Sequence, residues 1–411
     1  MKSLDRVRMD WVAREVRNTV GPEFIGSDTI FHYSIPVIDE TGDGRLEPTE
    51  DLGSSKTVLV GGEVLISKLN PRKARVLIAE GHDVPTVCSG EFVVLQPRDV
   101  ERRYLYWLLL SEVTRQELHS QVQSVTRSQQ RARPDDISKM WIELPSREAQ
   151  RAIASYLDAE TARIDALIGR KRDLLDLLAT RRASFVVALV AGKQDASPRA
   201  DLPWLAAVPS SWPTAPLGLL ADVFNGSTPE RQEGDLGGIP WTTSGDIDQG
   251  VITTPTAYIT DGVRRAHGLR IAPAGSIVVG LVGQGRPRGL SAQLAISTTL
   301  NQNLAAICPR DDRLDASYVG LLLGLAYDDL RNGGRGGNQA ALNCEMIKAY
   351  RLPVAPRDEQ TRLVDNVAVQ RTRDDAMAAL LTSSIELLLE RRQTLITAAV
   401  TGQLAIPGVA A

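Results

Sequence analysis

The sequence of 411 residues has few of the residues that build disulfide frameworks or metal sites. Its three cysteines, Cys88, Cys308 and Cys344, lie far apart and form no CxxC pair. It has four histidines, and none lies close to another in the sequence. Neither a disulfide scaffold nor a zinc site is indicated, and this cysteine usage is typical of a reducing compartment.

Long hydrophobic runs are absent as well. The longest apolar stretch, 318–327, has about half of the roughly 20 residues that cross a bilayer. The first residues, MKSLDRVRMDW, lack the apolar core of a signal peptide. We therefore expect a soluble, cytoplasmic protein that does not associate with membranes.

An excess of positive charge is also missing. The formal net charge is −3 and the isoelectric point is about 5.9, which argues against a protein coated in positive charge. These values leave room for a nucleic-acid binder whose positive charge is segregated. A hydrophobic content of 43% indicates a packed protein, and the chain length predicts two to three domains.

Catalytic and cofactor motifs are lacking too. There is no GxxxxGK[ST] phosphate loop, no GxGxxG after a strand and no HExxH. The segment PDDISK (134–139) loosely resembles a nuclease core, but its acids directly follow Pro134, and a helix-start cap is the better interpretation. The segment DETGDGRLEPTE (39–50) has calcium-loop spacing without convincing flanking helices, so we interpret it as a turn between strands. We predict no catalytic residue, no metal site and no cofactor in this chain.

What the chain does contain is an internal duplication. Residues 137–192 align without a gap with residues 347–402, at an offset of 210. The similarity extends upstream with small gaps, which gives two units of about 200 residues. The matched positions include Arg147 and Arg357, Gln150 and Gln360, Gly192 and Gly402, 62–66 and 275–279, 91–98 and 303–310, and Trp11 and Trp212.

A long helix is predicted at the end of each copy. Between Pro145 and residue 191 there is no further proline, and apolar residues recur every three or four positions. A helix of about 46 residues cannot bury its apolar stripe alone, so we predict that the two copies pack on each other. The alternative is that each helix folds onto its own globule.

The front of each copy is predicted to be a mixed α/β globule. Short strands are expected at 58–66 and 91–97, with counterparts at 275–282 and 303–309, and helices near 101–120 and 315–330. The predicted order is a globule over 1–145, a long helix over 146–192, a Pro-rich linker over 193–217, a second globule over 218–355, a second helix over 356–404 and a tail over 405–411.

Positive charge is concentrated in loops that contain no acidic residue. Such loops recur at matched places, 67–75 with 280–289 and 124–133 with 333–342. Arg can read guanine, Gln and Asn can read adenine, and Lys neutralises phosphates, so these loops are suited to DNA, although solvated surface loops share this composition. The predicted DNA-binding residues are Lys68, Arg72, Lys73, Arg75, Arg127, Gln129, Gln130, Arg131, Gln284, Arg286, Arg288, Arg335, Asn338 and Gln339.

Three segments give the duplication a family resemblance. LPSREAQRAIASYLDAETARIDALI (144–168) and LPVAPRDEQTRLV (352–364) resemble the start of each conserved helix in the specificity (S) subunit of type I restriction–modification systems. LPWLAAVPSSWPTAPLG (202–218) is similar to the family's start of a second recognition domain. The chain departs from the family at Ala149, where Glu is usual and Glu359 keeps it, and in having MDW in place of an LPxxW opening.

The resemblance implies a fold and a function. The fold is α+β, with two α/β target recognition domains, each followed by a long helix, and the helices packing as an antiparallel coiled coil with pseudo-two-fold duplication. Each domain would read one half of a bipartite site in double-stranded DNA, while the helices set the spacer and bind two methyltransferase subunits. Restriction/translocase subunits would be further partners. S-adenosylmethionine and ATP are expected only in those partner subunits, so this chain is not an enzyme.

Two other functions compete with this interpretation. One is a protein-binding coiled-coil scaffold without DNA readout, against which the acid-free loops argue. The other is a stand-alone nuclease, against which the missing cluster of acids argues.

Overall fold

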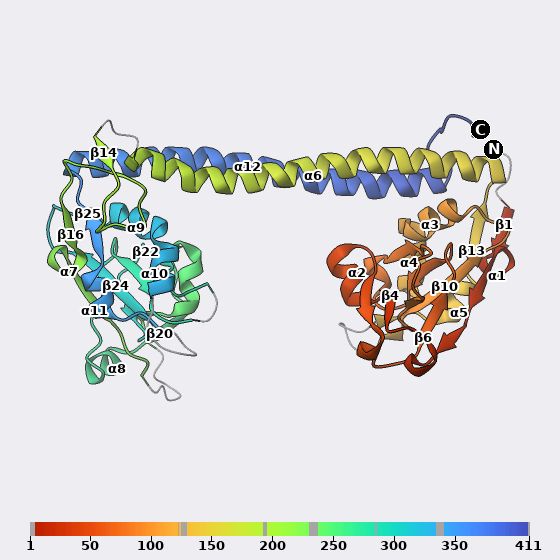
Figure 1. The fold of residues 1–411 in the computed structure, drawn as a ribbon, viewed down its shortest axis with the longest axis horizontal. Helices are drawn as coiled ribbons and strands as arrows, with labels where there is room; N and C mark the ends of the chain where they lie inside the picture. The colour runs from red at the N-terminus through yellow and green to blue at the C-terminus, as the bar shows by residue number, and fades with distance from the viewer. Residues whose placement is uncertain are drawn as a thin grey trace. The chain divides into compact units, whose positions relative to one another are not determined.

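The computed structural model describes residues 5–121, 123–124, 130–191, 195–229, 237–283, 286–333 and 341–409 (Figure 1). The chain forms two compact units. Unit 1 comprises residues 1–172 and 381–411, and unit 2 comprises residues 173–380. The long helices α6 (Arg147–Ala191) and α12 (Arg357–Val400) each contribute to both units.

Unit 1 is built on two sheets. The first has the antiparallel order β2 (Ala13–Val16), β10 (Phe92–Pro97), β7 (Val64–Ser67) and β8 (Val76–Ile78). The second has the order β3 (Thr19–Val20), β6 (Lys56–Leu59), β9 (Thr86–Cys88), β4 (Thr29–Tyr33) and β5 (Arg45–Pro48), in which β9 and β4 are parallel. Valine, isoleucine and leucine dominate the central strands, which are buried on both faces.

Short elements complete unit 1. The helices are α1 (Met9–Val12), α2 (Ile35–Thr41), α3 (Arg102–Leu110), α4 (Glu112–Ser120) and α5 (Pro134–Ser138). The single-turn helices are η1 (Pro22–Phe24), η2 (Thr49–Asp51) and η3 (Pro71–Lys73). Two strand pairs lie apart from the sheets, β1 (Asp5–Arg8) with β13 (Trp141–Leu144) and β11 (Gln123–Ser124) with β12 (Gln130–Arg131).

Unit 2 repeats this plan. Its main sheet has the order β17 (Ala221–Asn225), β24 (Leu304–Pro309), β21 (Ile277–Gly280), β22 (Ser291–Leu294) and β19 (Val251–Ile252). A second sheet has the order β20 (Ala257–Ile259), β18 (Ile239–Thr242) and β23 (Thr299–Leu300). The strand pairs outside these sheets are β16 (Thr214–Pro216) with β25 (Arg351–Pro353) and β14 (Ala196–Ser197) with β15 (Val208–Pro209). The helices are α7 (Leu217–Leu220), η4 (Ser244–Gln249), α8 (Asp261–Ala266), α9 (Ala316–Leu325), α10 (Tyr327–Gly333) and α11 (Cys344–Ala349).

The shared topology confirms the duplication and the predicted fold class. The order β2-β10-β7-β8 in unit 1 corresponds to β17-β24-β21-β22 in unit 2, and both units place a helix pair between the β10-type strand and the long helix. Details differ from the sequence prediction. The single strand expected over 58–66 is two strands, because Gly61 and Gly62 adopt positive φ and turn the chain. The helices expected over 101–120 and 315–330 are each two helices.

One predicted match is wrong. Trp11 lies in α1, which follows β1, and the equivalent element of unit 2 is α7, which follows β16. Trp11 therefore corresponds to Leu219 and is largely exposed, as Leu219 is. Trp212 instead precedes β16 and is buried, with its indole Nε1 donating to Oε2 of Glu359 at 3.0 Å.

The Pro-rich segment expected as a linker is packed within unit 2. Its apolar side chains, Leu202, Leu205, Val208 and Trp212, are buried in the same hydrophobic core as Tyr318. Apolar residues next to turn-forming prolines can be buried without a helix, so the segment is part of unit 2. The chain passes between the units within α6 and α12 instead.

The long helices pack on each other in antiparallel fashion inside each unit, as Figure 1 shows. In unit 1, Ile153 and Leu157 of α6 share a core with Ile396 and Val400 of α12 and with Leu105 of α3. This mutual packing confirms the predicted pairing of the helices. The α/β part of unit 1 packs on the same ends of α6 and α12. None of the helices among the described residues is long and apolar enough to cross a membrane.

Candidate nucleic-acid interface

In unit 1 the two acid-free loops meet. Lys68, Leu69 and Asn70 follow β7 and run beside β12, and Leu69 forms a β-bridge with Arg131. The backbone N–H of Asn70 donates to the carbonyl of Gln130 at 2.7 Å, and the N–H of Ala132 donates to the carbonyl of Lys68 at 2.9 Å. The Oδ1 of Asn70 also accepts from the N–H of Gln130. Two loops some 60 residues apart in the sequence thus form one surface.

The predicted residues differ in how they are placed on this surface. Arg72, Lys73 and Arg131 are exposed, and Lys68 and Gln130 are half-buried. Arg75 is buried, with only 6% of its side chain exposed. Two other predicted residues, Arg127 and Gln129, lie outside the described residues.

A tight turn presents Arg72 and Lys73. The turn is the single-turn helix η3, and the residues on either side, Asn70 and Ala74, have φ angles of 50° and 44°. Asn tolerates this left-handed conformation, but Ala normally avoids it, because its Cβ comes close to the following carbonyl oxygen. The turn is therefore strained at Ala74 and is held by its surroundings.

Two carboxylates from distant parts of the sequence reach this surface. Asp39, at the end of α2, accepts hydrogen bonds from Nε and Nη2 of Arg75 at 2.5 and 2.8 Å, and from Nζ of Lys73 at 3.1 Å. Glu91, next to β10, accepts from Nη2 of Arg131 at 2.8 Å. The hydrogen bond from Arg75, reinforced by Lys73, lowers the pKa of Asp39 to about 2. Sequence reasoning missed both acids, since each lies well outside the loop it contacts and no local pattern marks it.

Unit 2 has a corresponding arrangement. The loop after β21 contains Arg286, which is exposed, and Arg288, which is half-buried. The hydroxyl of Tyr327 donates to the carbonyl of Arg286 at 3.0 Å, and the N–H of Leu342 donates to the carbonyl of Leu281 at 2.8 Å. The loop after β21 thus adjoins the segment before α11, as in unit 1. The predicted residues Gln284, Arg335, Asn338 and Gln339 lie outside the described part of the chain.

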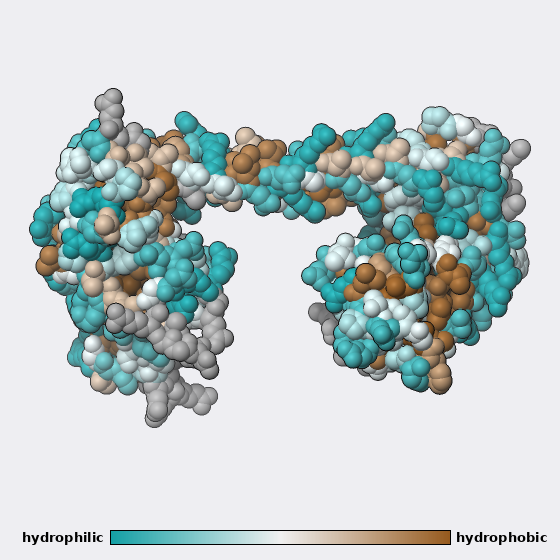
Figure 2. Space-filling model, viewed as in Figure 1, coloured by the Kyte–Doolittle hydropathy of each residue, from teal (hydrophilic) through white to brown (hydrophobic). Residues whose placement is uncertain are grey.

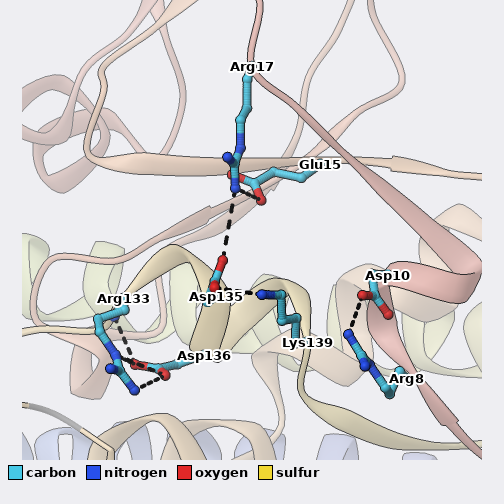
Figure 3. A network of polar contacts seen from close by, with 8 residues as sticks. All are labelled: Arg8, Asp10, Glu15, Arg17, Arg133, Asp135, Asp136 and Lys139. Carbon is cyan, nitrogen blue, oxygen red and sulfur yellow. Dashed lines mark hydrogen bonds and ion pairs between the residues drawn. The ribbon is translucent and has the colours of Figure 1, made fainter.

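The acids of PDDISK are occupied by cations rather than gathered for a metal. Figure 3 shows Asp135 between Lys139, at 2.6 Å, and Arg17, at 3.9 Å. Asp136 accepts from the backbone N–H of Arg133 at 3.0 Å and pairs with its guanidinium, which lowers the pKa of Asp136. This is the expected helix-start cap of α5. Within the described residues, no group of three or more His, Cys, Asp or Glu could hold a metal ion.

The segment with calcium-loop spacing also has another structure. Residues 39–41 are the last turn of α2, Gly42 follows in the left-handed conformation with φ of 81°, and β5 begins at Arg45. The segment is thus a turn from a helix to a strand, not the expected turn between strands. The carboxylate of Asp39, the first position of that pattern, is bound to Arg75.

Comparisons with known proteins agree with the duplicated architecture. Residues 22–175 match the family model of the type I restriction modification DNA specificity domain. A stretch of 160 residues is 26% identical to the specificity subunit of the type I restriction enzyme EcoR124I/EcoR124II from Escherichia coli. This match covers 38% of the chain and 39% of the length of that relative.

Two solved structures have the same fold over almost the whole chain. One belongs to a study of complex assembly and conformational transition in a type I restriction–modification system, with a TM-score of 0.78, 18% identity, and coverage of 98% of this chain and 99% of that chain. The other is the HsdS subunit from Thermoanaerobacter tengcongensis, with a TM-score of 0.55, 18% identity and 97% coverage of both chains. Residues 22–175 therefore match the DNA specificity domain of type I restriction–modification systems, and almost the whole chain has the fold of these two structures, one of which is an HsdS subunit.

Proposed function

We propose that this protein is the DNA sequence-specificity subunit of a type I restriction–modification complex. Each unit would read one half of a bipartite target in double-stranded DNA. The observation that carries this proposal is the recurrence of one arrangement in both units. A basic loop follows the equivalent strands β7 and β21, and in each unit it is joined by backbone hydrogen bonds to a second acid-free segment.

The residues on these loops supply the two kinds of contact that DNA reading needs. Exposed Lys73 and Arg72 are suited to phosphates or to guanine edges, and Gln130 to adenine. In unit 2 the corresponding contacts would come from Arg286 and Arg288. The residues outside the described part of the chain, Arg127, Gln129, Gln284, Arg335, Asn338 and Gln339, remain proposed contacts on the composition of their loops alone.

We infer that the long helices bind two copies of a methyltransferase subunit. Exposed apolar residues occur at positions that the duplication relates, Leu167 with Met377 and Leu177 with Leu387, and these four side chains are 45% to 65% exposed. Unit 1 contains Leu167 and Leu387, whereas unit 2 contains Leu177 and Met377. Figure 2 shows apolar side chains among polar ones along the helices. A repeated apolar surface fits one partner bound twice.

The chain itself would perform no chemistry in this complex. Methylation with S-adenosylmethionine, and cleavage driven by ATP, would belong to the methyltransferase and restriction/translocase subunits. The paired helices would set the length of the nonspecific spacer between the half-sites, because half-site spacing follows from protein geometry. A protein that reads DNA in this way is expected to work in the cytoplasm.

Selection from a randomised DNA duplex pool tests the proposal. The chain would be co-expressed with its methyltransferase subunit, and the complex used to enrich bound duplexes. The expected result is a split motif with a spacer of fixed length. A single uninterrupted motif would mean that only one unit reads DNA. No enrichment at all would overturn the proposal in favour of a protein-binding scaffold.

A further inference from the structure

The basic turn of unit 1 is closed by a side chain that does not face solvent. Arg75 follows the turn, and its Nη1 donates to the carbonyl of Leu69, which precedes the turn, at 3.0 Å. Its Nε and Nη2 donate to the two carboxylate oxygens of Asp39. Arg75 thus joins both ends of the turn to the end of α2.

The contacts of Arg75 hold the strained backbone of the turn in place. Ala74 has a φ of 44°, a conformation that is unfavourable for alanine, and such conformations persist only where the surroundings hold them. The two parallel hydrogen bonds from a buried guanidinium to a carboxylate are among the strongest and most directional polar contacts in proteins. A lysine at position 75 would keep the charge but could not make this fork.

The burial of Arg75 also limits what it can do for DNA. Its side chain is 6% exposed, whereas the side chain of Lys73, two residues earlier, is 51% exposed and Arg72 is exposed too. Its hydrogen-bonding face is directed at Asp39 and at the backbone of Leu69. Contact with a phosphate or a base edge would require breaking these bonds and leaving Asp39 without its main partner.

We propose that Asp39 and Arg75 are positioning residues, which hold the turn 70–74 so that Arg72 and Lys73 contact the first half-site, and that Arg75 does not itself touch DNA. This inference rests on the proposed function. It gives Arg75 a role different from the DNA contact that the composition of loop 67–75 predicts. It also makes Asp39, an acidic residue, one of the residues that shape the DNA-reading surface.

The test uses Arg75→Lys, Asp39→Asn and Arg72→Ala in the full chain with its methyltransferase subunit. Duplex selection reports both half-sites, so the half-site read by unit 2 is an internal control for folding and assembly. Arg75→Lys and Asp39→Asn are expected to relax preference at the first half-site about tenfold. The slope of log affinity against log salt is expected not to fall in Asp39→Asn, which frees Lys73 from its ion pair, or in Asp39→Asn combined with Arg75→Gln, which also removes the charge of Arg75. Arg72→Ala is expected to reduce that slope by about 1.

A second variant separates positioning from loss of stability. Ala74→Gly removes the strain at the positive φ, so Arg75→Lys with Ala74→Gly is expected to recover part of the first half-site preference lost in Arg75→Lys. A reduced salt slope in Asp39→Asn combined with Arg75→Gln, which removes both charges of the pair, would show that Arg75 contacts phosphate and would overturn the inference. So would an unchanged first half-site in both Arg75→Lys and Asp39→Asn. Failure of the wild-type complex to enrich any motif would instead overturn the proposed function.

Discussion

The guanidinium Nη2 of Arg182, on α6, lies 2.5 Å from Oδ1 of Asp375, on α12. The same relationship occurs in unit 1 with the helices exchanged, where Nε of Arg392 lies 3.0 Å from Oδ1 of Asp165. Each residue of the first pair is 210 positions from its counterpart in the second. The sequence duplication is therefore also a duplication of the contacts that align the helices.

Reversing one of these charges tests the alignment. Arg182→Asp would place a new carboxylate beside Asp374 and Asp375, so it is expected to lower the free energy of unfolding by about 1 kcal/mol or somewhat more. Arg182→Asp combined with Asp375→Arg is expected to recover most of that loss. A double-mutant cycle in urea unfolding measures the coupling. Arg172→Asp, on the same helix, is the control, and equal losses for Arg172→Asp and Arg182→Asp would contradict the pairing.

The equivalent glutamines Gln150 and Gln360 show how much could be predicted from the sequence. The alignment matched them, and both are buried. Gln150 accepts from the N–H of Glu101 at 2.7 Å, and Gln360 accepts from the N–H of Asp315 at 2.8 Å, just before α3 and α9. Repetition and helical periodicity are recorded in residue order, so the duplicated fold and the long helices could be predicted.

Contacts between distant segments could not be predicted in this way. Asp39 and Arg75 are in contact because the end of α2 lies beside the loop between β7 and β8. No periodic pattern in the sequence indicates that contact. Similarly, the short segment around Trp11 can be aligned with unit 2 in more than one way. The pairing of β1 with β13, which matches that of β16 with β25, identifies Leu219 as its counterpart. Glu359, the counterpart of Ala149, accepts a hydrogen bond from Trp212, and the sequence has no tryptophan before Trp11 that could play this part in unit 1.

His32 gives unit 1 a predicted pH dependence. Its ring is buried, its Nδ1 lies 2.7 Å from Oε2 of Glu47, and its Nε2 has no hydrogen-bond partner among the described residues. Burial lowers the pKa of His32, and the bond to Glu47 only partly opposes this effect. The unfolded chain therefore takes up a proton at a higher pH than the folded chain does, so stability falls as pH drops from about 6.5 towards the folded pKa.

Unfolding measured between pH 5 and pH 7.5 tests this prediction. His32→Gln removes the titrating ring while its amide can still donate to Glu47, so it is expected to flatten the pH dependence of stability over this range. His119→Gln changes an exposed histidine on α4 and should leave the dependence as it is. Identical pH profiles for wild type and His32→Gln would refute the assignment.

Glu91 restrains one of the proposed DNA contacts. Its pairing with Arg131 holds a cation that would otherwise be available to a phosphate. Glu91→Gln is expected to raise affinity for DNA of any sequence and to steepen the slope of log affinity against log salt by up to about 1. Binding titrations at several salt concentrations measure both quantities. Glu148→Gln makes the same charge change at the start of α6, and an equal effect there would show that only net charge matters.

The two apolar positions on each unit predict a stoichiometry. Leu167→Asp with Leu387→Asp alters the exposed surface of unit 1 alone, and Leu177→Asp with Met377→Asp alters that of unit 2 alone. Each double variant is expected to bind one methyltransferase subunit, and the variant with all four changes none, because a buried charge at an apolar interface has no partner. Native mass spectrometry counts the subunits. Val113→Asp, at an exposed apolar position on α4, serves as the control and should still bind two.

The register of the helices predicts how the spacer responds to their length. Seventeen positions separate Asp165 from Arg182 on α6, and seventeen separate Asp375 from Arg392 on α12, so equal insertions inside both intervals leave both ion pairs matched. A second copy of residues 166–172 after Arg172, with a second copy of residues 378–384 after Ser384, lengthens each helix by about 10 Å and rotates its faces by only about 20°.

Duplex selection with this double insertion should give a longer spacer, by at most about three base pairs at 3.4 Å each, with both half-site sequences unchanged. The insertion in α6 alone displaces Arg182 from Asp375 by two turns and is expected to weaken helix pairing instead. Altered half-sites with the double insertion would mean that the helices also shape the recognition loops. An unchanged spacer would mean that the helix pair does not set the distance between the half-sites, because the only change made is to the length that separates the two matched ion pairs.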